Sequence, residues 1–203
     1  MPKQPTVDVF PIFRTEHQAE ILRLLLLQPE RKFKGMELAD LTGRPKQTTS
    51  AELKRLVSAG IITEEEVATA KLYQAATDSP FYPHLRALVE LSMGPETELR
   101  RRLSEIDGIE VAVMFGSWAR GTGLRPTSDV DVLVVGTAPY EKLADAANEV
   151  EPLIGRDVQI VSFTWDELDQ RIAADSGFVA NVLGGPLKPL VGDVELLRER
   201  TAK

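Results

Sequence analysis

The sequence of 203 residues contains no cysteine and only two histidines, His17 and His84. Without cysteine the chain can form neither a disulfide nor a thiolate metal site, and two histidines so far apart in the sequence do not make a zinc cluster. Each histidine is expected on a helix, at the surface or half-buried, and not as a ligand. These absences argue against thiolate chemistry and against a histidine base.

Long apolar runs are also missing. The run of leucines Leu24–Leu27 has four residues and the apolar run Val111–Phe115 has five, whereas a membrane-spanning helix needs about 20. The N-terminus lacks a basic segment followed by an apolar core, so we expect no secretory signal and a cytoplasmic protein. Hydrophobic residues make up 43% of the chain and charged residues 27%, which indicates an ordinary globular protein of one large domain or two small ones.

The net charge is unevenly distributed along the chain. Residues 1–94 carry 12 basic and 12 acidic side chains, and residues 95–203 carry 12 and 19, which accounts for the whole net charge of −7. Within the first half, residues 31–60 carry seven basic side chains against three acidic ones. This local excess of positive charge could face a polyanion.

The most informative stretch is VAVMFGSWARGTGLRPTSDVDVLVVG, residues 111–136. Its two apolar runs are short and rich in β-branched residues, which predicts two buried strands. Gly116 and Ser117 follow the first run, where a sharp turn into a helix would direct backbone N–H groups at an anion. Asp129 and Asp131 alternate along the second run, so both carboxylates face one side and could hold Mg²⁺ or Mn²⁺. This combination is the equipment of phosphoryl or nucleotidyl transfer.

The spacing of Gly-Ser and Asp-x-Asp resembles the nucleotidyltransferase superfamily that includes DNA polymerase β, most closely its minimal nucleotidyltransferase branch. The resemblance implies an α/β domain with a small mixed sheet, which binds a nucleoside triphosphate together with a divalent metal. Asp129 and Asp131 would be the metal ligands and catalytic carboxylates. Arg120 and Arg125 lie in the intervening loop, where they could reach a triphosphate, although Arg120 could instead hold the loop by a salt bridge. The implied nucleotide-binding set is Gly116, Ser117, Arg120, Arg125 and Ser128.

A third carboxylate is where the sequence departs from this family. Related minimal transferases resemble Gly-Arg-x-Val-Asp-x-Val on the next strand, and here residues 155–161 read GRDVQIV. Gln159 therefore occupies the position of the acid, and glutamine can neither carry negative charge nor accept a proton usefully. Asp157, about 7 Å away on the same strand face, could replace it as a catalytic residue or could be a solvated strand end. Whether the domain transfers a nucleotide or only binds one is left open.

The first half has the pattern of a winged helix. Helices are predicted over residues 15–28, 35–41 and 46–59, with a tight turn at 42–45, and strand-like pieces follow at 63–66 and 71–75. A further helix is predicted within 79–92. The breaker pair Gly94-Pro95 then predicts a boundary between domains 1–94 and 95–203. The expected fold class is α+β: a winged helix-turn-helix followed by the α/β transferase-like domain.

Residues 15–92 are similar to winged helix-turn-helix regulators of the arsenic-repressor (ArsR) type, through LADLTG at 38–43, LKRL at 53–56 and GII at 60–62. The likeness implies a homodimer that binds double-stranded DNA. Base edges would be contacted by Gln47, Thr48, Thr49 and Ser50, and phosphates by Arg44, Lys46, Lys54 and Arg55. The lack of cysteine departs from the metal-sensing members. Glu64, Glu65 and Glu66 at the wing would repel DNA, so the alternative is a module that holds a partner or a second subunit.

The leading hypothesis is a DNA-binding transcription regulator fused to a nucleotidyltransferase-type domain that binds Mg²⁺ and a nucleoside triphosphate. A second hypothesis is a non-catalytic regulator in which the triphosphate is an effector. A third is an enzyme that modifies a macromolecule and is targeted by its winged helix.

Overall fold

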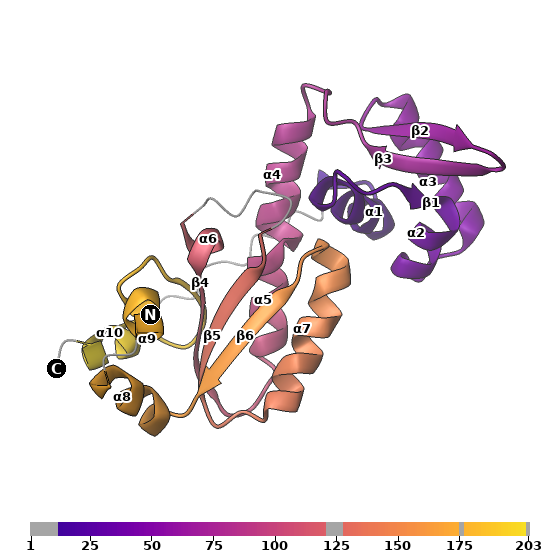
Figure 1. Ribbon diagram of the computed structural model, residues 1–203. Coiled ribbons are helices and arrows are strands. Elements are labelled where there is room, and N and C mark those ends of the chain that lie inside the picture. The colour runs from indigo at the N-terminus through magenta and orange to yellow at the C-terminus, as the bar shows by residue number, and fades with distance from the viewer. Residues whose placement is uncertain (1–11, 121–127, 175–176, 202–203) are drawn as a thin grey trace. The chain divides into compact units, whose positions relative to one another are not determined.

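The computed structural model describes residues 12–120, 128–174 and 177–201 (Figure 1). Contacts divide the chain into two compact units, Met1–Gly94 and Pro95–Lys203. The expected fold class is confirmed, because the first unit has the elements of a winged helix-turn-helix and the second has helices around a small mixed sheet. In the described part of the chain, every helix is too short or too polar to span a membrane.

The first unit begins with a capped helix and a helix-turn-helix. Its elements are α1 (Glu16–Leu27), β1 (Phe33–Lys34), α2 (Gly35–Thr42), α3 (Lys46–Ser58), β2 (Ile62–Val67), β3 (Ala70–Ala75) and α4 (Tyr82–Met93). The Thr15 hydroxyl caps α1 by accepting from the backbone N–H of Gln18 at 3.1 Å. Gly43 adopts φ +63° after α2, and its N–H donates to the Asp40 carbonyl, which turns the chain tightly into α3.

Leucines from α1, α2 and α3 form the core of the first unit. Leu25 of α1, Leu38 of α2 and Leu53 of α3 are fully buried. The wing is the antiparallel pair β2 and β3, and β1 adds a third strand through the register Phe33↔Tyr73. The sheet order is therefore β1-β3-β2. Strand β1 was not predicted, because two residues carry no periodic pattern of their own.

The second unit is a sheet of order β6-β5-β4-β7, in which β5 and β6 are parallel and the other pairs antiparallel. Its elements are α5 (Pro95–Leu103), β4 (Ile109–Phe115), α6 (Gly116–Ala119), β5 (Val130–Gly136), α7 (Tyr140–Ile154), β6 (Val158–Phe163), α8 (Trp165–Ala173), α9 (Gly177–Leu183), β7 (Lys188–Val191) and α10 (Glu195–Thr201). The two strands predicted within residues 111–136 are β4 and β5.

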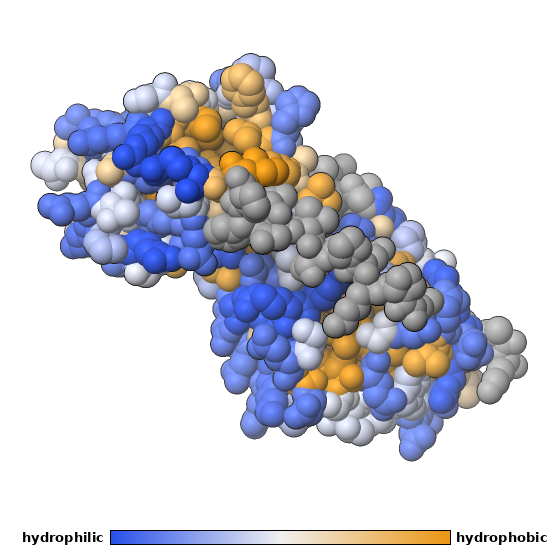
Figure 2. Space-filling model, turned by 180° about the vertical axis from the view of Figure 1, so that it is seen from behind, coloured by the Kyte–Doolittle hydropathy of each residue, from blue (hydrophilic) through white to orange (hydrophobic). Residues whose placement is uncertain are grey.

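Helices cover both faces of this sheet. Helices α5 and α7 lie on one side, and α8, α9 and α10 lie on the other (Figure 1). Leu133 and Val135 of β5 belong to the apolar cluster formed with α8, α9 and α10. Since strand side chains alternate, Asp131 points to that same side, at the end of the strand where the apolar cluster stops. In a space-filling view from behind, hydrophobic patches on both units are bordered by hydrophilic side chains (Figure 2).

Candidate functional site

The glycine-serine turn and the second aspartate lie against each other in the second unit. Gly116 follows the last residue of β4 and has φ +68°, a conformation that favours glycine. A Cβ added to Gly116 would overlap Asp131 Oδ2 and lie 3.3 Å from Asp131 Cγ. Phe115 pairs directly with Asp131 across β4 and β5, which places the carboxylate beside the turn. The fold thus brings together two features that are fifteen residues apart in the sequence.

The charges around Asp131 indicate a place for a cation. Burial raises the pKa of the Asp131 carboxyl, the neighbouring charge of Asp129 raises this pKa further, and the Arg120 guanidinium opposes both effects. Asp129 and Arg120 are exposed, whereas Asp131 is half-buried. A hard divalent ion would relieve the repulsion between the two carboxylates, and oxygen donors of this kind suit Mg²⁺ or Mn²⁺.

The neighbouring strand contributes an amide at this position. Gln159 of β6 pairs in register with Asp131, so the two side chains share one face of the sheet on strands about 4.8 Å apart. Asp157 precedes β6, and its carbonyl accepts from the backbone N–H of Val130 at 2.9 Å, which brings it beside Asp129. Within the described residues, no group of three His, Cys, Asp or Glu side chains is arranged to hold a metal. The donors that fit a divalent cation are therefore two carboxylates and the amide oxygen of Gln159.

A buried arginine, Arg156, links the segment before β5 to the Gly116-Ser117 turn, and the sequence analysis gave it no role in the site. Arg156 has 9% of its surface exposed, its Nη1 donates to the Ser128 carbonyl at 3.4 Å, and its guanidinium lies 5.7 Å from the centre of the Trp118 ring. Trp118 follows Ser117 in α6, so Arg156 links the segment before Asp129 to the turn. Its signal in the sequence was the arginine of the Gly-Arg pair before β6. Arg125 lies outside the described residues.

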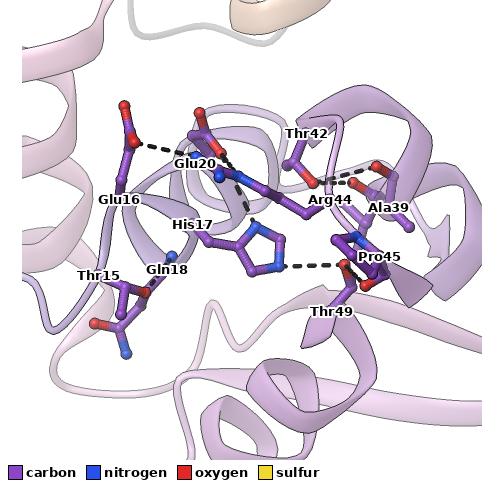
Figure 3. A network of polar contacts seen from close by, with 11 residues as sticks. Thr15, Glu16, His17, Gln18, Glu20, Ala39, Thr42, Arg44, Pro45 and Thr49 are labelled. Atoms are coloured by element: carbon purple, nitrogen blue, oxygen red, sulfur yellow. Dashed lines mark hydrogen bonds and ion pairs between the residues drawn. The ribbon is translucent and has the colours of Figure 1, made fainter. Parts of the chain in front are cut away.

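In the first unit, α3 presents most of the predicted base-reading side chains, with one exception. Gln47, Thr48 and Ser50 are exposed, but Thr49 is fully buried. The Thr49 hydroxyl donates to the Pro45 carbonyl at 3.2 Å and lies 3.2 Å from Nε2 of His17 (Figure 3). The prediction that Thr49 faces a base edge is therefore wrong, because this side of α3 packs against α1.

His17 is also more deeply placed than the sequence indicated. We expected a surface or half-buried helix residue, and the structure has His17 buried at 7% exposure between α1 and α3. Its Nδ1 lies 3.9 Å from the Glu20 carboxylate (Figure 3). Burial lowers the pKa of His17, Glu20 raises it and Arg44 lowers it. A neutral imidazole whose Nε2–H donates to Thr49 is consistent with these contacts, and it joins α1 to α3.

Ion pairs neutralise much of the positive charge that the sequence places in residues 31–60. Arg44 Nη2 lies 3.0 Å from Glu16 of α1 (Figure 3), and Arg55 Nη1 lies 3.0 Å from Glu52. Glu52 is buried at 2% exposure and also accepts from Arg14 and Gln18. Arg44 and Arg55, predicted phosphate contacts, thus already have carboxylate partners.

The wing glutamates are similarly paired. Glu64 lies 2.5 Å from Lys71, and Glu65 pairs with Lys32. The hydrogen bond from Lys71 lowers the pKa of Glu64, and the charge of Lys54 adds to this effect. Among the described residues, Lys46 at the start of α3 has no ion-pair partner. The expected repulsion between DNA and the wing is therefore reduced, and so is the expected attraction to α3.

Comparison with known proteins identifies the segment that contains the Gly116–Asp131 site. Residues 96–179 match the family model of the nucleotidyltransferase domain. No curated protein matches the chain.

Three solved structures are similar to parts of the chain. A chain from a toxin-antitoxin complex with AMP-PNP is 20% identical; the match spans 53% of this chain and 82% of that chain, with a TM-score of 0.40. A homodimeric winged helix-turn-helix DNA-binding domain from Mycobacterium bovis, described as a possible ArsR-family regulator, is 24% identical, with coverage of 45% and 88% and a TM-score of 0.30. A tri-AMPylated HEPN toxin of Shewanella oneidensis in complex with its MNT antitoxin is 15% identical, with coverage of 53% and 81% and a TM-score of 0.34. The segment that matches the family model contains Gly116, Asp129 and Asp131.

Proposed function

We propose that the second unit binds a nucleoside triphosphate with Mg²⁺ or Mn²⁺ and transfers a nucleoside monophosphate to an acceptor hydroxyl. We further propose that the first unit binds double-stranded DNA as a transcription regulator. One observation carries the first proposal: the Asp131 carboxylate lies against Gly116, with Asp129 beside it, in a segment that matches the nucleotidyltransferase family.

In the proposed reaction, the acceptor hydroxyl attacks the α-phosphorus in line and pyrophosphate leaves. Asp129 and Asp131 would hold the divalent cation, which when bound supplies charge stabilisation at the phosphates. The hydroxyls of Ser117 and Ser128 and the guanidinium of Arg120 would bind phosphate oxygens. Arg125, which lies outside the described residues, would join them.

The proton of the attacking hydroxyl needs a base, and Gln159 cannot serve as one. Asp157, just before β6, is the candidate, because its carbonyl is hydrogen-bonded to Val130 next to Asp129 and its side chain is exposed. Transfer thus depends on how far Asp157 can replace the missing acid.

The test of transfer is incubation of the full-length protein with each α-³²P-labelled nucleoside triphosphate and Mg²⁺ or Mn²⁺. We expect pyrophosphate release and label on an acceptor, both lost in Asp129→Ala/Asp131→Ala. Asp145→Ala, which removes an exposed carboxylate from α7, is the matched control and should keep the wild-type rate. Label on a co-purifying protein or RNA would favour the macromolecule-modifying function. No pyrophosphate and no label with any nucleotide would exclude transfer.

The neutral Gln159 opposite Asp131 favours a second candidate, in which the triphosphate is an effector and is not consumed. In this case nucleotide binding shifts DNA affinity, and DNA shifts nucleotide affinity by the same factor. Fluorescence anisotropy of a labelled duplex, with and without Mg-ATP, measures the first shift. Equal DNA affinity in both conditions would count against an effector.

The proposed DNA contacts are the exposed side chains of α3, with a homodimer reading two half-sites. They are Lys46, Gln47, Thr48, Ser50 and Lys54. If Lys46 contacts a phosphate, Lys46→Ala should lower the slope of log affinity against log salt by about 1. Lys142→Ala, an exposed lysine of α7, should leave the slope unchanged. Sedimentation analysis tests the homodimer independently.

A further inference from the structure

An exposed aromatic ring lies beside the Gly116–Asp131 site. Phe178 of α9 has 43% of its surface exposed. Its ring meets the edge of the Phe115 ring, with centroids 5.9 Å apart and an angle of 81° between the planes. Phe115 pairs across the sheet with Asp131. Asp131, Phe115 and Phe178 therefore form a continuous row that runs from a carboxylate to an exposed phenyl ring.

The core of the unit fixes the position of Phe178. Val179 and Val182 bury one side of α9 in the cluster that also contains Leu133. Phe178 consequently lies off this buried side and cannot turn into the core without moving the helix. A Cβ added to the neighbouring Gly177 would meet no atom within 4 Å, so the start of α9 is uncrowded at that position. Leaving a phenyl ring in water is unfavourable, and a flat apolar ligand would relieve this cost.

The length of the row suits one nucleotide. Directly opposed residues of an antiparallel pair have Cβ atoms about 5 Å apart. Adding the length of the Phe115 side chain and the ring separation of 5.9 Å places the Phe178 ring at most on the order of 15 Å from Asp131. A ligand that is anionic at one end and aromatic at the other matches this order of polar and apolar groups, as a nucleoside triphosphate does.

We propose that Phe178 stacks on the nucleobase of the triphosphate and is a binding residue of the nucleotide site. This inference rests on the proposed function and extends it from the phosphates to the base. Because every base has a π-face, such stacking favours a nucleotide over a bare polyphosphate without selecting one base strongly.

Calorimetry on the full-length protein separates the two ends of the ligand. Mg-ATP carries phosphates and a base, and Mg-tripolyphosphate carries phosphates only. Phe178→Ala and Phe178→Leu should weaken Mg-ATP binding by about 5- to 150-fold, the range that loss of one base stack produces. Both variants should bind Mg-tripolyphosphate like the wild type, and Phe178→Trp should keep Mg-ATP affinity.

Two controls make the outcome decisive. Tyr140→Ala removes an aromatic ring that is 62% exposed at the start of α7, and it should leave Mg-ATP binding unchanged. Phe178→Leu keeps apolar bulk at the site, so it reports on the loss of the ring even if Phe178→Ala perturbs α9. Unchanged Mg-ATP affinity in Phe178→Leu, or an equal loss of Mg-ATP and Mg-tripolyphosphate, would overturn the stacking role alone. A wild-type protein that binds neither ligand would overturn the proposed function and this inference with it.

Discussion

The close contact between Gly116 and Asp131 makes a quantitative prediction for Gly116→Ala. Alanine at φ +68° adopts a left-handed conformation at a cost of about 1–2 kcal/mol, partly offset by about 0.4–1 kcal/mol from the lower entropy of the unfolded chain. The new methyl group also overlaps Asp131 Oδ2, and moving this carboxylate off its rotamer costs about 0.5–1.5 kcal/mol. We expect the second unit to lose roughly 0.5–3 kcal/mol in total.

Gly60→Ala is the matched control. Gly60 has φ +67°, and a Cβ there would meet no atom within 4 Å. This substitution has the same conformational cost without the overlap, so it should destabilise its own unit by roughly 0–1.5 kcal/mol. Urea denaturation of the full chain measures both effects by circular dichroism. Both tryptophans, Trp118 and Trp165, lie in the second unit, so their fluorescence follows its unfolding selectively.

A double-mutant cycle isolates the contact. Asp131→Ala removes the carboxylate and leaves only Cβ, which lies 3.6 Å from the added methyl position, an ordinary van der Waals distance. Gly116→Ala should therefore cost about 0.5–1.5 kcal/mol less in the Asp131→Ala background than in the wild type. A coupling energy of zero, together with a cost at Gly116 no larger than at Gly60, would refute the placement of the carboxylate against the turn.

Three further predictions follow from the contacts described above. Thr49→Val should destabilise the first unit by about 1–3 kcal/mol, because it leaves the buried Nε2–H of His17 without an acceptor. The control Thr48→Val should change stability by less than about 0.5 kcal/mol and should weaken DNA binding. Denaturation measures the stability and anisotropy the binding, and equal stability losses in the two variants would contradict the burial of Thr49. The lowered pKa of His17 means that the unfolded chain binds the proton more readily, so the first unit should lose stability as pH falls below about 6.5. The difference in melting temperature between pH 7.5 and pH 5.5 should therefore be smaller in His17→Asn than in the wild type. An equal difference in both proteins would exclude His17 as the cause. Gln159→Asp should raise label transfer by about 100-fold or more if the missing acid limits the reaction, and Gln159→Asn is the control that should not.

Local sequence signals predicted most of the elements. The tight turn at residues 42–45 and the two buried strands within residues 111–136 depend mainly on neighbouring residues, and each appears in the structure. The two-residue strand β1 was missed, since its hydrogen-bonding partner β3 lies far along the chain.

Contacts between distant elements explain where the site predictions differed from the structure. The start of α3 contains four uncharged polar residues in a row, and only the packing of α1 decides that Thr49 is covered while Thr48 remains exposed. Likewise, the count of basic side chains could not reveal that Arg44 pairs with Glu16, 28 residues away. Charge composition describes what a segment carries, and folding decides how much of that charge remains unpaired.

The sequence by itself predicted the two-part organisation, the glycine-serine turn, two aspartates separated by one residue and the glutamine at the position of an acid. Only the tertiary structure decided that the Asp131 carboxylate lies against Gly116, that Gln159 pairs in register with Asp131, and that Phe178 stands exposed beside Phe115. The physical reason is that backbone periodicity sets the direction of a side chain relative to its own strand or helix, whereas its neighbours come from elements that meet only when the sheet closes.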